Sequence, residues 1–396
     1  MATGLTKAEV NSRFYNTVGG EILFETEAQS YLHPLAVARL VAAYANASGK
    51  RDLKILEIGA NNCVFATSLL KLLTQLRVHN EAMVSKVEYF AVEYARRSLQ
   101  AALVEYAESG FDQVTPGPAE SPLVGSLTRT GPPQLALYLV HAEANQFVAG
   151  GSGRFDFVIL NELLDDLPCR VFYCDAGGVK REFAALAEPA GKQWRVTIGA
   201  DETEDESLAD MPPSTLTATS AESLSLVRGA SARLESGGML LVHDYGFTER
   251  YTDIAKYEPV PKVPEFVSLE LPDAGEQPFP RSFFRIFGND EGNVVQITTD
   301  VNFAELTDEL SGGGRVIILP HGNAKLASRS SVEDEDYLRK GDGIFLSEFG
   351  ALEMGDDLSA LLARLDAEQE GLRDSFVKEF LPVGASLYAD LVFVKN

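Results

Sequence analysis

The stretch that decides the fold runs Lys54-Ile-Leu-Glu-Ile-Gly-Ala-Asn-Asn-Cys-Val-Phe-Ala66. It predicts a short apolar strand with an acidic residue near its end, a tight turn of small residues, and the start of a helix. This order suits a nucleotide-type cofactor, because the turn lets the backbone approach a ligand and the helix N-terminus offers free N–H groups. A second predicted strand, Val87-Glu-Tyr-Phe-Ala-Val-Glu93, ends in a carboxylate that can bind a ribose diol. One crossover helix near residues 62–77 fits between the two strands.

Strand and helix patterns alternate along most of the remaining chain. The main strands are predicted at 53–58, 87–93, 135–140, 155–160 and 238–244, and the helices near 62–77, 95–108 and 220–234. Strands separated by helix-length segments favour an α/β fold, a doubly wound and mostly parallel sheet that binds ligands at the carboxyl ends of its strands. Further strands are expected at 293–299, 315–319 and 389–395, with a helix near 357–380.

The domain organisation follows from these patterns. Residues 1–50 are predicted to form a mainly helical N-terminal segment. Residues 51–396 are expected to form one domain that carries insertions near 169–215 and 247–290.

Three segments are interpreted from local composition. Residues 171–185 predict a hairpin that turns at Gly177-Gly178. Residues 111–133 are rich in Gly, Pro and Ser and predict a loop. The acidic run over 200–210 lacks apolar periodicity and is expected to be a solvated loop.

Composition limits the classes of function. The formal net charge of −24 would repel nucleic acid and anionic membranes, and it is compatible with a basic substrate. Acidic solubility alone accounts for most of this charge. No apolar run is as long as a membrane helix, and the first residues do not resemble a signal peptide, so we expect a cytoplasmic protein. Three cysteines and five scattered histidines predict neither a disulfide framework nor a metal site.

The spelling Glu57-x-Gly59 is similar to the first motif of class I S-adenosylmethionine-dependent methyltransferases, which runs Glu-x-Gly-x-Gly-x-Gly. The later glycines of that motif fall on Asn61 and Cys63. Asparagine tolerates positive φ better than most residues, so Asn61 is compatible with the turn. A dinucleotide-dependent oxidoreductase is less favoured, because its GxGxxG pattern requires glycine at Asn61 and Val64.

Four further segments resemble the MidA-type methyltransferases, the bacterial relatives of the mitochondrial complex I assembly arginine methyltransferase. Asn161-Glu-Leu-Leu-Asp-Asp-Leu-Pro168 resembles the family signature Asn-Glu-x-x-Asp-Ala-Leu-Pro. Val92–Leu99 is similar to the second motif of the family, Gly237–Gly246 to its fifth strand, and Thr298–Phe303 to a later segment. The resemblance spans roughly residues 50–396.

The resemblance implies a class I methyltransferase fold, S-adenosyl-L-methionine as the cofactor, and arginine on a protein as the methyl acceptor. The cofactor-binding residues that it implies are Glu57, Gly59, Asn61, Glu93, Glu143 and Asn161. Glu93 is expected to bind the ribose hydroxyls. Glu143 is expected near the adenine amino group, and N-capping of a helix is the alternative for this residue.

The candidate catalytic residues are Asn161, Glu162 and Asp165. Methyl transfer from a sulfonium is an in-line displacement, so the enzyme mainly has to orient the acceptor. A guanidinium stays charged and its lone pair is delocalised. Two carboxylates and an amide carbonyl could hold it and favour localisation of charge on the attacked nitrogen. Helix capping is the alternative for Asn161 and Asp165.

Three functions stay open at this point. Methylation of a protein arginine is the leading one. Methyl transfer to a small basic metabolite would need the same cofactor site. A degenerate, cofactor-binding protein that acts in assembly or interaction is the third, and the replaced glycines of the first motif favour it. The sequence predicts no oligomeric state.

Overall fold

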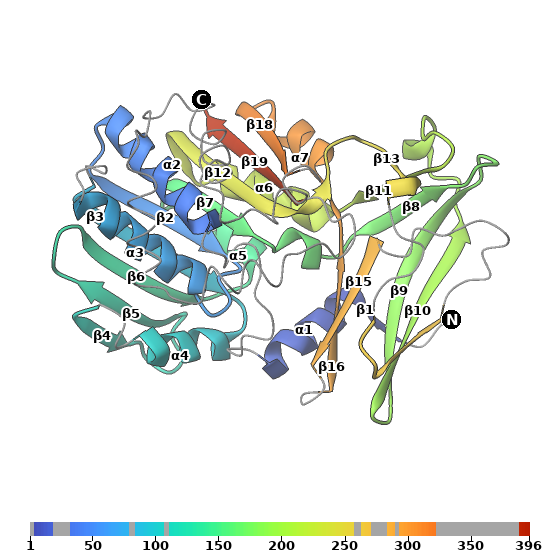
Figure 1. Cartoon of the computed structure of the whole chain (residues 1–396), viewed down its shortest axis with the longest axis horizontal. Coiled ribbons are helices and arrows are strands. Elements are labelled where there is room, and N and C mark those ends of the chain that lie inside the picture. Colours follow the sequence, from blue (N-terminus) through green and yellow to red (C-terminus); the bar gives the residue numbers. More distant parts are fainter. Residues whose placement is uncertain are drawn as a thin grey trace, which may run out of the picture.

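The computed structural model describes residues 4–18, 32–78, 84–106, 111–256, 263–270, 283–289, 293–321 and 388–396. These segments form a larger sheet with helices on both faces and a second, mostly antiparallel sheet (Figure 1). Helix α1 (Lys7–Val18) contacts both parts. Toward the larger sheet, the hydroxyl of Tyr94 donates to the Ser12 carbonyl at 2.7 Å. Toward the other part of the fold, the Asn11 amide donates to the Ile297 carbonyl at 2.9 Å.

The centre of the larger sheet consists of parallel strands. Their spatial order is β12 (Leu234–Phe247), β7 (Phe155–Asn161), β2 (Asp52–Ile58), β3 (Lys86–Glu93) and β6 (Gln134–His141). The chain builds outward from β2 through β3 to β6 and then returns to β7 on the other side of β2. At such a reversal the connections leave toward opposite faces, so a crevice forms between the carboxyl ends of β2 and β7. The expected doubly wound, mostly parallel sheet is confirmed.

Antiparallel strands extend this sheet at both edges. Beside β12 lie β19 (Tyr388–Lys395) and then β18 (Gly314–His321). Beside β6 lie β5 (Leu123–Arg129) and β4 (Gln113–Pro116). The short strand β17 (Val301–Asn302) pairs with the end of β12.

The prediction of a loop over residues 111–133 is wrong, because β4 and β5 form a hairpin there. Gly125 of β5 is a packing position rather than a loop signal, since a Cβ at this residue would lie 2.8 Å from the Leu103 δ carbons. Leu127 of the same strand is fully buried. At Gly125 the glycine therefore marks a close approach of strand and helix, where composition alone predicted a loop.

Helices cover both faces of the larger sheet (Figure 1). One face carries α2 (Leu32–Ser48), α3 (Val64–Val78) and α4 (Arg96–Glu105), and the other carries α5 (Ala144–Gly150), α6 (Ala221–Ala232) and α7 (Phe303–Leu310). Strand β2 explains this arrangement. Leu53 and Ile55 belong to the first core, whereas Leu56 and Ile58 belong to the second. Because strand side chains alternate, a strand with apolar residues on both sides must be buried on both.

The second sheet is built from later residues and one N-terminal strand. Its order is β13 (Thr252–Asp253), β11 (Thr215–Thr219), β8 (Arg170–Cys174), β9 (Lys180–Ala190), β10 (Gln193–Glu202) and β14 (Val267–Glu270), with β1 (Leu5–Thr6) beside β9. The antiparallel pair β15 (Phe284–Asn289) and β16 (Val294–Thr299) packs with it around the buried Trp194. We propose that β8 to β11 and β13 to β15 are the insertions expected near 169–215 and 247–290, and that β1 and β16 complete this part of the fold.

Two local predictions have clear outcomes in this sheet. The hairpin at 171–185 is confirmed, and Gly178 takes φ +86° in its turn. The solvated loop over 200–210 is partly wrong, because β10 continues to Glu202. An ion pair of 3.6 Å joins Glu202 to Arg181 of the neighbouring strand, so an acidic residue is compatible with pairing there.

Helix content was expected in the first 50 residues, and α1 and α2 supply it in the described part of that segment. Short 3₁₀ turns follow at η3 (Glu206–Leu208) and η4 (Ile254–Lys256). The helix predicted near 357–380 lies outside the described residues. No helix of the described segments is long and apolar enough to cross a membrane.

Candidate functional site

A cavity of about 380 Å³ opens at the carboxyl ends of β2, β3 and β7, where the strand order reverses, and α1 forms its opposite wall. Its volume is within the range of small-molecule sites, roughly 300–1,000 Å³. The charged residues that line it are all acidic: Glu57, Glu93, Glu143, Glu162 and Asp166. Among the residues that the structure describes, no Lys, Arg or His lines this cavity. Its charge therefore favours a cationic ligand.

The turn after β2 keeps the geometry of a glycine-rich loop although only the first glycine is present. The N–H groups of Gly59 and Ala60 donate to the Val92 carbonyl at 2.9 and 3.1 Å. Gly59 has φ +80°, and Asn61 and Cys63 take φ +44° and +62°. Side chains are disfavoured in this region of φ, and asparagine least. The two replaced glycines are thus accommodated as left-handed residues within the same turn.

Asn62 is a site residue that sequence reasoning missed. Its side chain is only 1% exposed and lines the cavity. Neither its amide nitrogen nor its amide oxygen has a hydrogen-bond partner among the described residues. Buried polar groups are normally paired, so an amide left open at a cavity wall is suited to bind a ligand. Its place in the turn was the only sequence signal available.

The Glu93 carboxylate is held by the backbone at the end of β3. One oxygen accepts from the N–H of Asn61 at 2.9 Å, and the other accepts from the N–H of Ala95 at 2.8 Å. Burial raises the pKa of Glu93, and hydrogen bonds from the backbone of Ala95, Asn61 and Tyr94 oppose that rise. This carboxylate therefore joins the turn after β2 to the end of β3, and it faces the cavity in a fixed orientation.

Glu57 lies at the end of β2, buried and facing the cavity. The Tyr89 hydroxyl donates to its Oε2 at 3.0 Å. Burial raises the pKa of Glu57 to about 7, and the side chains of Tyr89 and Asn161 oppose this rise. A carboxyl that titrates near neutrality in a cavity is typical of a functional site.

Asn161 ends β7 and is also buried at the cavity wall. Its Oδ1 lies 3.1 Å from Nε2 of His33, at the start of α2. Its Nδ2 lies near Glu57 and has no hydrogen-bond partner of ordinary geometry in the described structure. The amide carbonyl, which we expected to hold an acceptor, is therefore turned away from the cavity, and the amide N–H groups are what Asn161 offers there.

Glu162 follows Asn161 in the lining of the cavity and has φ +45°, a left-handed conformation that is unfavourable for glutamate. Its N–H donates to the His243 carbonyl at 2.7 Å, which fixes the backbone in this turn. The Tyr245 hydroxyl donates to its Oε2 at 3.4 Å. Strained residues persist only where the surroundings determine them, and they are frequent in ligand sites.

The structure does not bring Asp165 to the cavity. Asp165 lies in the 3₁₀ turn η2 (Leu164–Asp166), and its N–H and that of Leu164 donate to Oδ2 of Asp244 at 3.2 and 2.9 Å. Burial and the neighbouring Asp244 raise the pKa of Asp165 well above its usual range. The next residue, Asp166, lines the cavity in its place. Asp166 stands where the MidA-type signature has alanine, so the motif gave no reason to choose it.

Helix α1 holds Asp166 at the cavity wall. The Asn11 amide donates to its Oδ1 at 2.9 Å, the Gln296 amide donates to the same oxygen at 2.8 Å, and the Tyr15 hydroxyl donates to its Oδ2 at 2.5 Å. All three donors are neutral, so the carboxylate is satisfied without a counter-charge from them. Sequence reasoning missed Asn11 and Tyr15, because their partners are more than 100 residues away in the chain.

Glu143 lies at the edge of the cavity and is exposed. Its side chain accepts from the N–H groups of Asn145 and Gln146, at 3.0 and 2.8 Å, and so caps the N-terminus of α5. The capping alternative for this residue is therefore realised. Its carboxylate still contributes negative charge to the rim.

Comparison with known proteins agrees with this architecture. A solved structure of an uncharacterized protein from Burkholderia thailandensis is similar over 99% of this chain and 87% of that one, with 17% sequence identity and a TM-score of 0.55. A second solved structure from that organism, bound to S-adenosyl-homocysteine, is 16% identical with a TM-score of 0.48, over 99% of this chain and 79% of that one. At these identities the first similarity supports the fold.

No curated protein matches the chain. Residues 36–262 match the model of a family described as S-adenosyl-L-methionine-dependent methyltransferases. The matched region includes the parallel strands and all the cavity walls except α1. Because this region is more than half of the chain, the protein belongs to this family of S-adenosyl-L-methionine-dependent methyltransferases, as its resemblance to the MidA type predicted.

Proposed function

We propose that this methyltransferase transfers the methyl group to one nitrogen of a cationic acceptor group, with the guanidinium of arginine on a protein as that acceptor. The observation that carries the proposal is the charge of the cavity, whose charged lining residues are all acidic. Such a cavity attracts a guanidinium and repels phosphates and carboxylates. Methyl transfer to a small basic metabolite is the second candidate, because α1 forms one wall of the cavity and narrows the space for an acceptor.

The cofactor end of the cavity fits S-adenosyl-L-methionine. The two oxygens of Glu93 are fixed by backbone N–H groups and keep lone pairs for the hydroxyls of a ribose diol. The open amides of Asn62 and Asn161 can satisfy polar groups of the ligand. Glu57 supplies a carboxyl for the amino group of the cofactor. Gly59 and Asn61 let the backbone approach without a clash, as the left-handed turn requires. When bound, this cofactor supplies an electrophilic methyl group on a sulfonium.

The acceptor end consists of Glu162 and Asp166. Both face the cavity, and they lie on the loop that follows β7, next to Asn161. A guanidinium held between carboxylates has its charge localised by charge-assisted hydrogen bonds, which leaves one nitrogen better able to attack. The methylated nitrogen must then release a proton. Glu162 is the carboxylate that accepts it, because Asp166 already accepts three hydrogen bonds. We therefore assign Glu162 as the catalytic residue and Asp166 as its partner in binding the acceptor.

Asp165 takes a different role in this proposal. Its backbone N–H is held by Asp244, and its backbone carbonyl accepts from Lys7 Nζ at 2.5 Å. It supports the shape of the loop that carries Glu162 and Asp166 and does not touch the acceptor. The degenerate alternative is weakened by the turn after β2, which keeps left-handed geometry at Asn61 and Cys63 in spite of the replaced glycines.

The test incubates the protein with labelled S-adenosyl-L-methionine and a cell extract, and locates the label by mass spectrometry. Glu162→Gln should keep cofactor affinity and lower the rate of methyl transfer roughly 10- to 1000-fold, about the loss of one oriented charged contact. Asp165→Asn is the matched comparison in the same loop, and it should change stability while the rate per folded enzyme is kept. Label on a metabolite would show that the methyl acceptor is a small molecule and not a protein. Bound cofactor with no label transferred would favour the degenerate alternative.

A further inference from the structure

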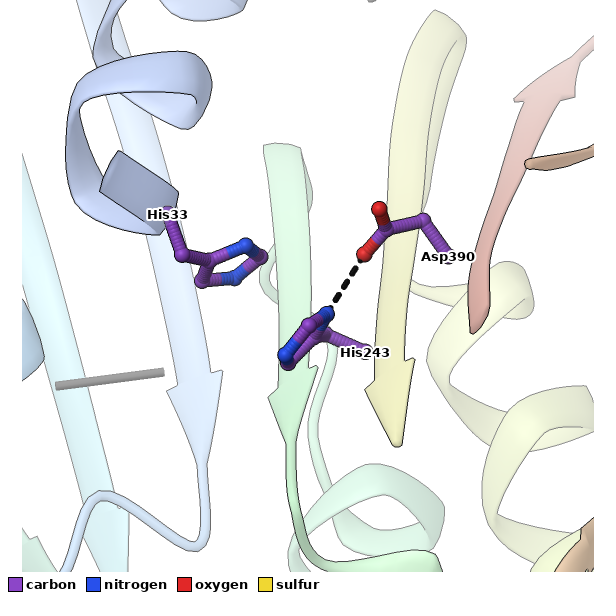
Figure 2. A group of neighbouring side chains, drawn as sticks. All are labelled: His33, His243 and Asp390. Atoms are coloured by element: carbon purple, nitrogen blue, oxygen red, sulfur yellow. Dashed lines mark hydrogen bonds and ion pairs between the residues drawn. The ribbon is translucent and has the colours of Figure 1, made fainter. Parts of the chain in front are cut away.

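Three buried side chains meet behind the cavity wall. Figure 2 shows His33, at the start of α2, with its ring against that of His243 on β12, and Asp390 on β19 beside His243. The strand register explains why these side chains lie side by side. His243 pairs with Asn161 of β7 on one side and with Asp390 of β19 on the other. Side chains at paired positions point to the same face of a sheet. Asn161, His243 and Asp390 therefore line up under His33.

The contacts in this group run from β19 to the wall of the cavity. Nδ1 of His243 lies 2.6 Å from Oδ1 of Asp390, which is a hydrogen bond from the imidazole to the carboxylate. The rings of His33 and His243 are stacked, with centroids 4.0 Å apart and an angle of 28° between their planes. Nε2 of His33 lies 3.1 Å from Oδ1 of Asn161, at the cavity wall. The group thus connects the strand β19 to a residue that faces the ligand.

A metal ion is the obvious alternative for two histidines and an aspartate whose ligand atoms all lie within 4.8 Å. Two observations disfavour it. Lone pairs of stacked imidazoles lie in nearly parallel planes and do not converge on one point. Two ligands of a tetrahedral ion at about 2.0–2.1 Å would be separated by roughly 3.3 Å, whereas Nδ1 of His243 and Oδ1 of Asp390 are at hydrogen-bond distance, 2.6 Å.

We propose that His33 is a positioning residue that sets the orientation of the Asn161 amide, with the His243–Asp390 pair supporting its ring. This inference rests on the proposed function, because it assumes that the ligand contacts the face of Asn161 in the cavity. A donor N–H on Nε2 of His33 pairs with the Asn161 carbonyl, which turns the amide N–H groups toward Glu57 and the cavity. The reverse orientation would place the carbonyl against the Glu57 carboxylate, where the two oxygens repel each other.

Two neighbours within the described structure act on that amide: His33 contacts its carbonyl, and the Glu57 carboxyl lies near its NH₂ group. Asn161 Nδ2 has no hydrogen-bond partner of ordinary geometry, so among the described residues His33 supplies the one well-formed hydrogen bond to the amide. Asn161 is 8% exposed, so water does not compete freely for its carbonyl. A ligand that accepts a hydrogen bond from Asn161 needs the N–H groups ready in that direction. His33 prepares this orientation in advance, which lowers the ordering cost of binding.

The experiment measures binding of S-adenosyl-homocysteine by calorimetry to the wild-type chain, His33→Phe and His33→Gln. Phenylalanine keeps a flat ring for stacking and removes the donor, whereas the glutamine amide nitrogen can take the place of Nε2. His33→Phe should bind roughly 5- to 50-fold more weakly, and His33→Gln should stay within about 3-fold of wild type, as expected for one hydrogen bond at a buried amide. Tyr44→Phe is the matched control on α2, because it removes a hydrogen bond to Asp156 (3.2 Å) outside the cavity lining.

A second measurement does not depend on binding or on the variants folding. Long-range ¹H–¹⁵N NMR of histidine-labelled wild-type protein should find a proton on Nε2 of His33; a bare Nε2 would overturn the inference. Unchanged affinity in a folded His33→Phe, or equal losses in both His33 variants, would also overturn it. Stoichiometric binding of Zn²⁺ that is lost in Asp390→Asn would replace it with a metal site. A wild-type chain that binds no S-adenosyl-homocysteine would instead contradict the proposed function, and the NMR result would still decide the amide orientation.

Discussion

Replacement of Glu93 by glutamine is the sharpest test of how the cofactor end of the cavity is built. The two carboxylate oxygens each face a backbone N–H, from Asn61 at 2.9 Å and from Ala95 at 2.8 Å. A glutamine amide has only one oxygen. Whichever way it turns, its NH₂ group must face a backbone N–H that it cannot accept from. The substitution therefore breaks one hydrogen bond without changing the size of the side chain.

The magnitude follows from these contacts. Loss of a hydrogen bond to a charged group costs about 1.5–3 kcal/mol. Part of this loss is offset, because burial raises the pKa of Glu93 and the charge itself is therefore unfavourable in the folded state. We expect a net loss of about 1–2 kcal/mol in the free energy of unfolding, or roughly 2–5 °C in Tm. A ribose diol that donates to Glu93 would also lose a charge-assisted bond, so the affinity for S-adenosyl-homocysteine should fall roughly 10- to 100-fold.

Thermal unfolding and calorimetric titration of the same samples measure the two effects. Glu88→Gln is the matched control, because Glu88 lies on the same strand and forms a surface ion pair with Lys86 at 2.8 Å away from the cavity. Its stability should change by less than about 0.5 kcal/mol and its affinity should not change. A folded Glu93→Gln variant with wild-type affinity would refute the role of Glu93 in ligand binding, whatever its Tm.

Three further predictions concern stability, each measured by denaturant unfolding. Burial holds the pKa of Glu57 at about 7, above its ordinary 4.5, so the folded protein keeps a proton that the unfolded chain releases and stability falls as pH rises from about 4.5 to 7. Glu57→Gln should reduce this decline by about 2–3 kcal/mol, and a parallel decline in the variant would contradict the assignment. Asn61→Ala should lower the free energy of unfolding by about 1 kcal/mol and Asn61→Gly should change it little, because only alanine puts a poorly tolerated side chain at φ +44°. Equal effects of the two substitutions would contradict the argument from backbone strain. Tyr15→Phe should lower the free energy of unfolding by about 1–3 kcal/mol, because the half-buried Asp166 loses a donor, and an unchanged free energy of unfolding would show that the Tyr15 hydroxyl does not stabilise this carboxylate.

The part of the site that the sequence predicted consists of residues next to strong local patterns. Glu57 and Glu93 each end an apolar strand, and strand ends of a doubly wound sheet meet at one edge. Asn161 and Glu162 follow the fully buried strand β7 in the same way. Their positions depend only on strand boundaries and strand order. A correct sheet is therefore enough to bring them together.

The missed residues depend on contacts that have no local pattern. Asn11 bonds the backbone of Ile297, 286 positions away, and His33 bonds Asn161, 128 positions away. Neither helix position differs in sequence from an ordinary buried polar residue. Asp165 was predicted as a site residue instead of Asp166. It does not reach the cavity, for a related reason. Adjacent residues in a tight turn point in different directions, and the direction is set by the hydrogen bonds to Asp244 rather than by spacing.

The acidic groups around the cavity explain why these distant contacts are needed. Burial raises the pKa of Glu57 and Asp244 to about 7, and it also raises the pKa of Asp165 and Asp166. Like charges this close destabilise the folded chain unless donors or a cation compensate them. Neutral donors from α1, and backbone N–H groups for Asp244, supply part of that compensation. The positive charge of Lys7 supplies a further part, because it lowers the pKa of Asp165 and Asp166. Under the proposed function, a cationic cofactor and a cationic acceptor would relieve more of the unfavourable charge. A site of this kind gives up stability of the empty protein in order to favour ligands of one charge.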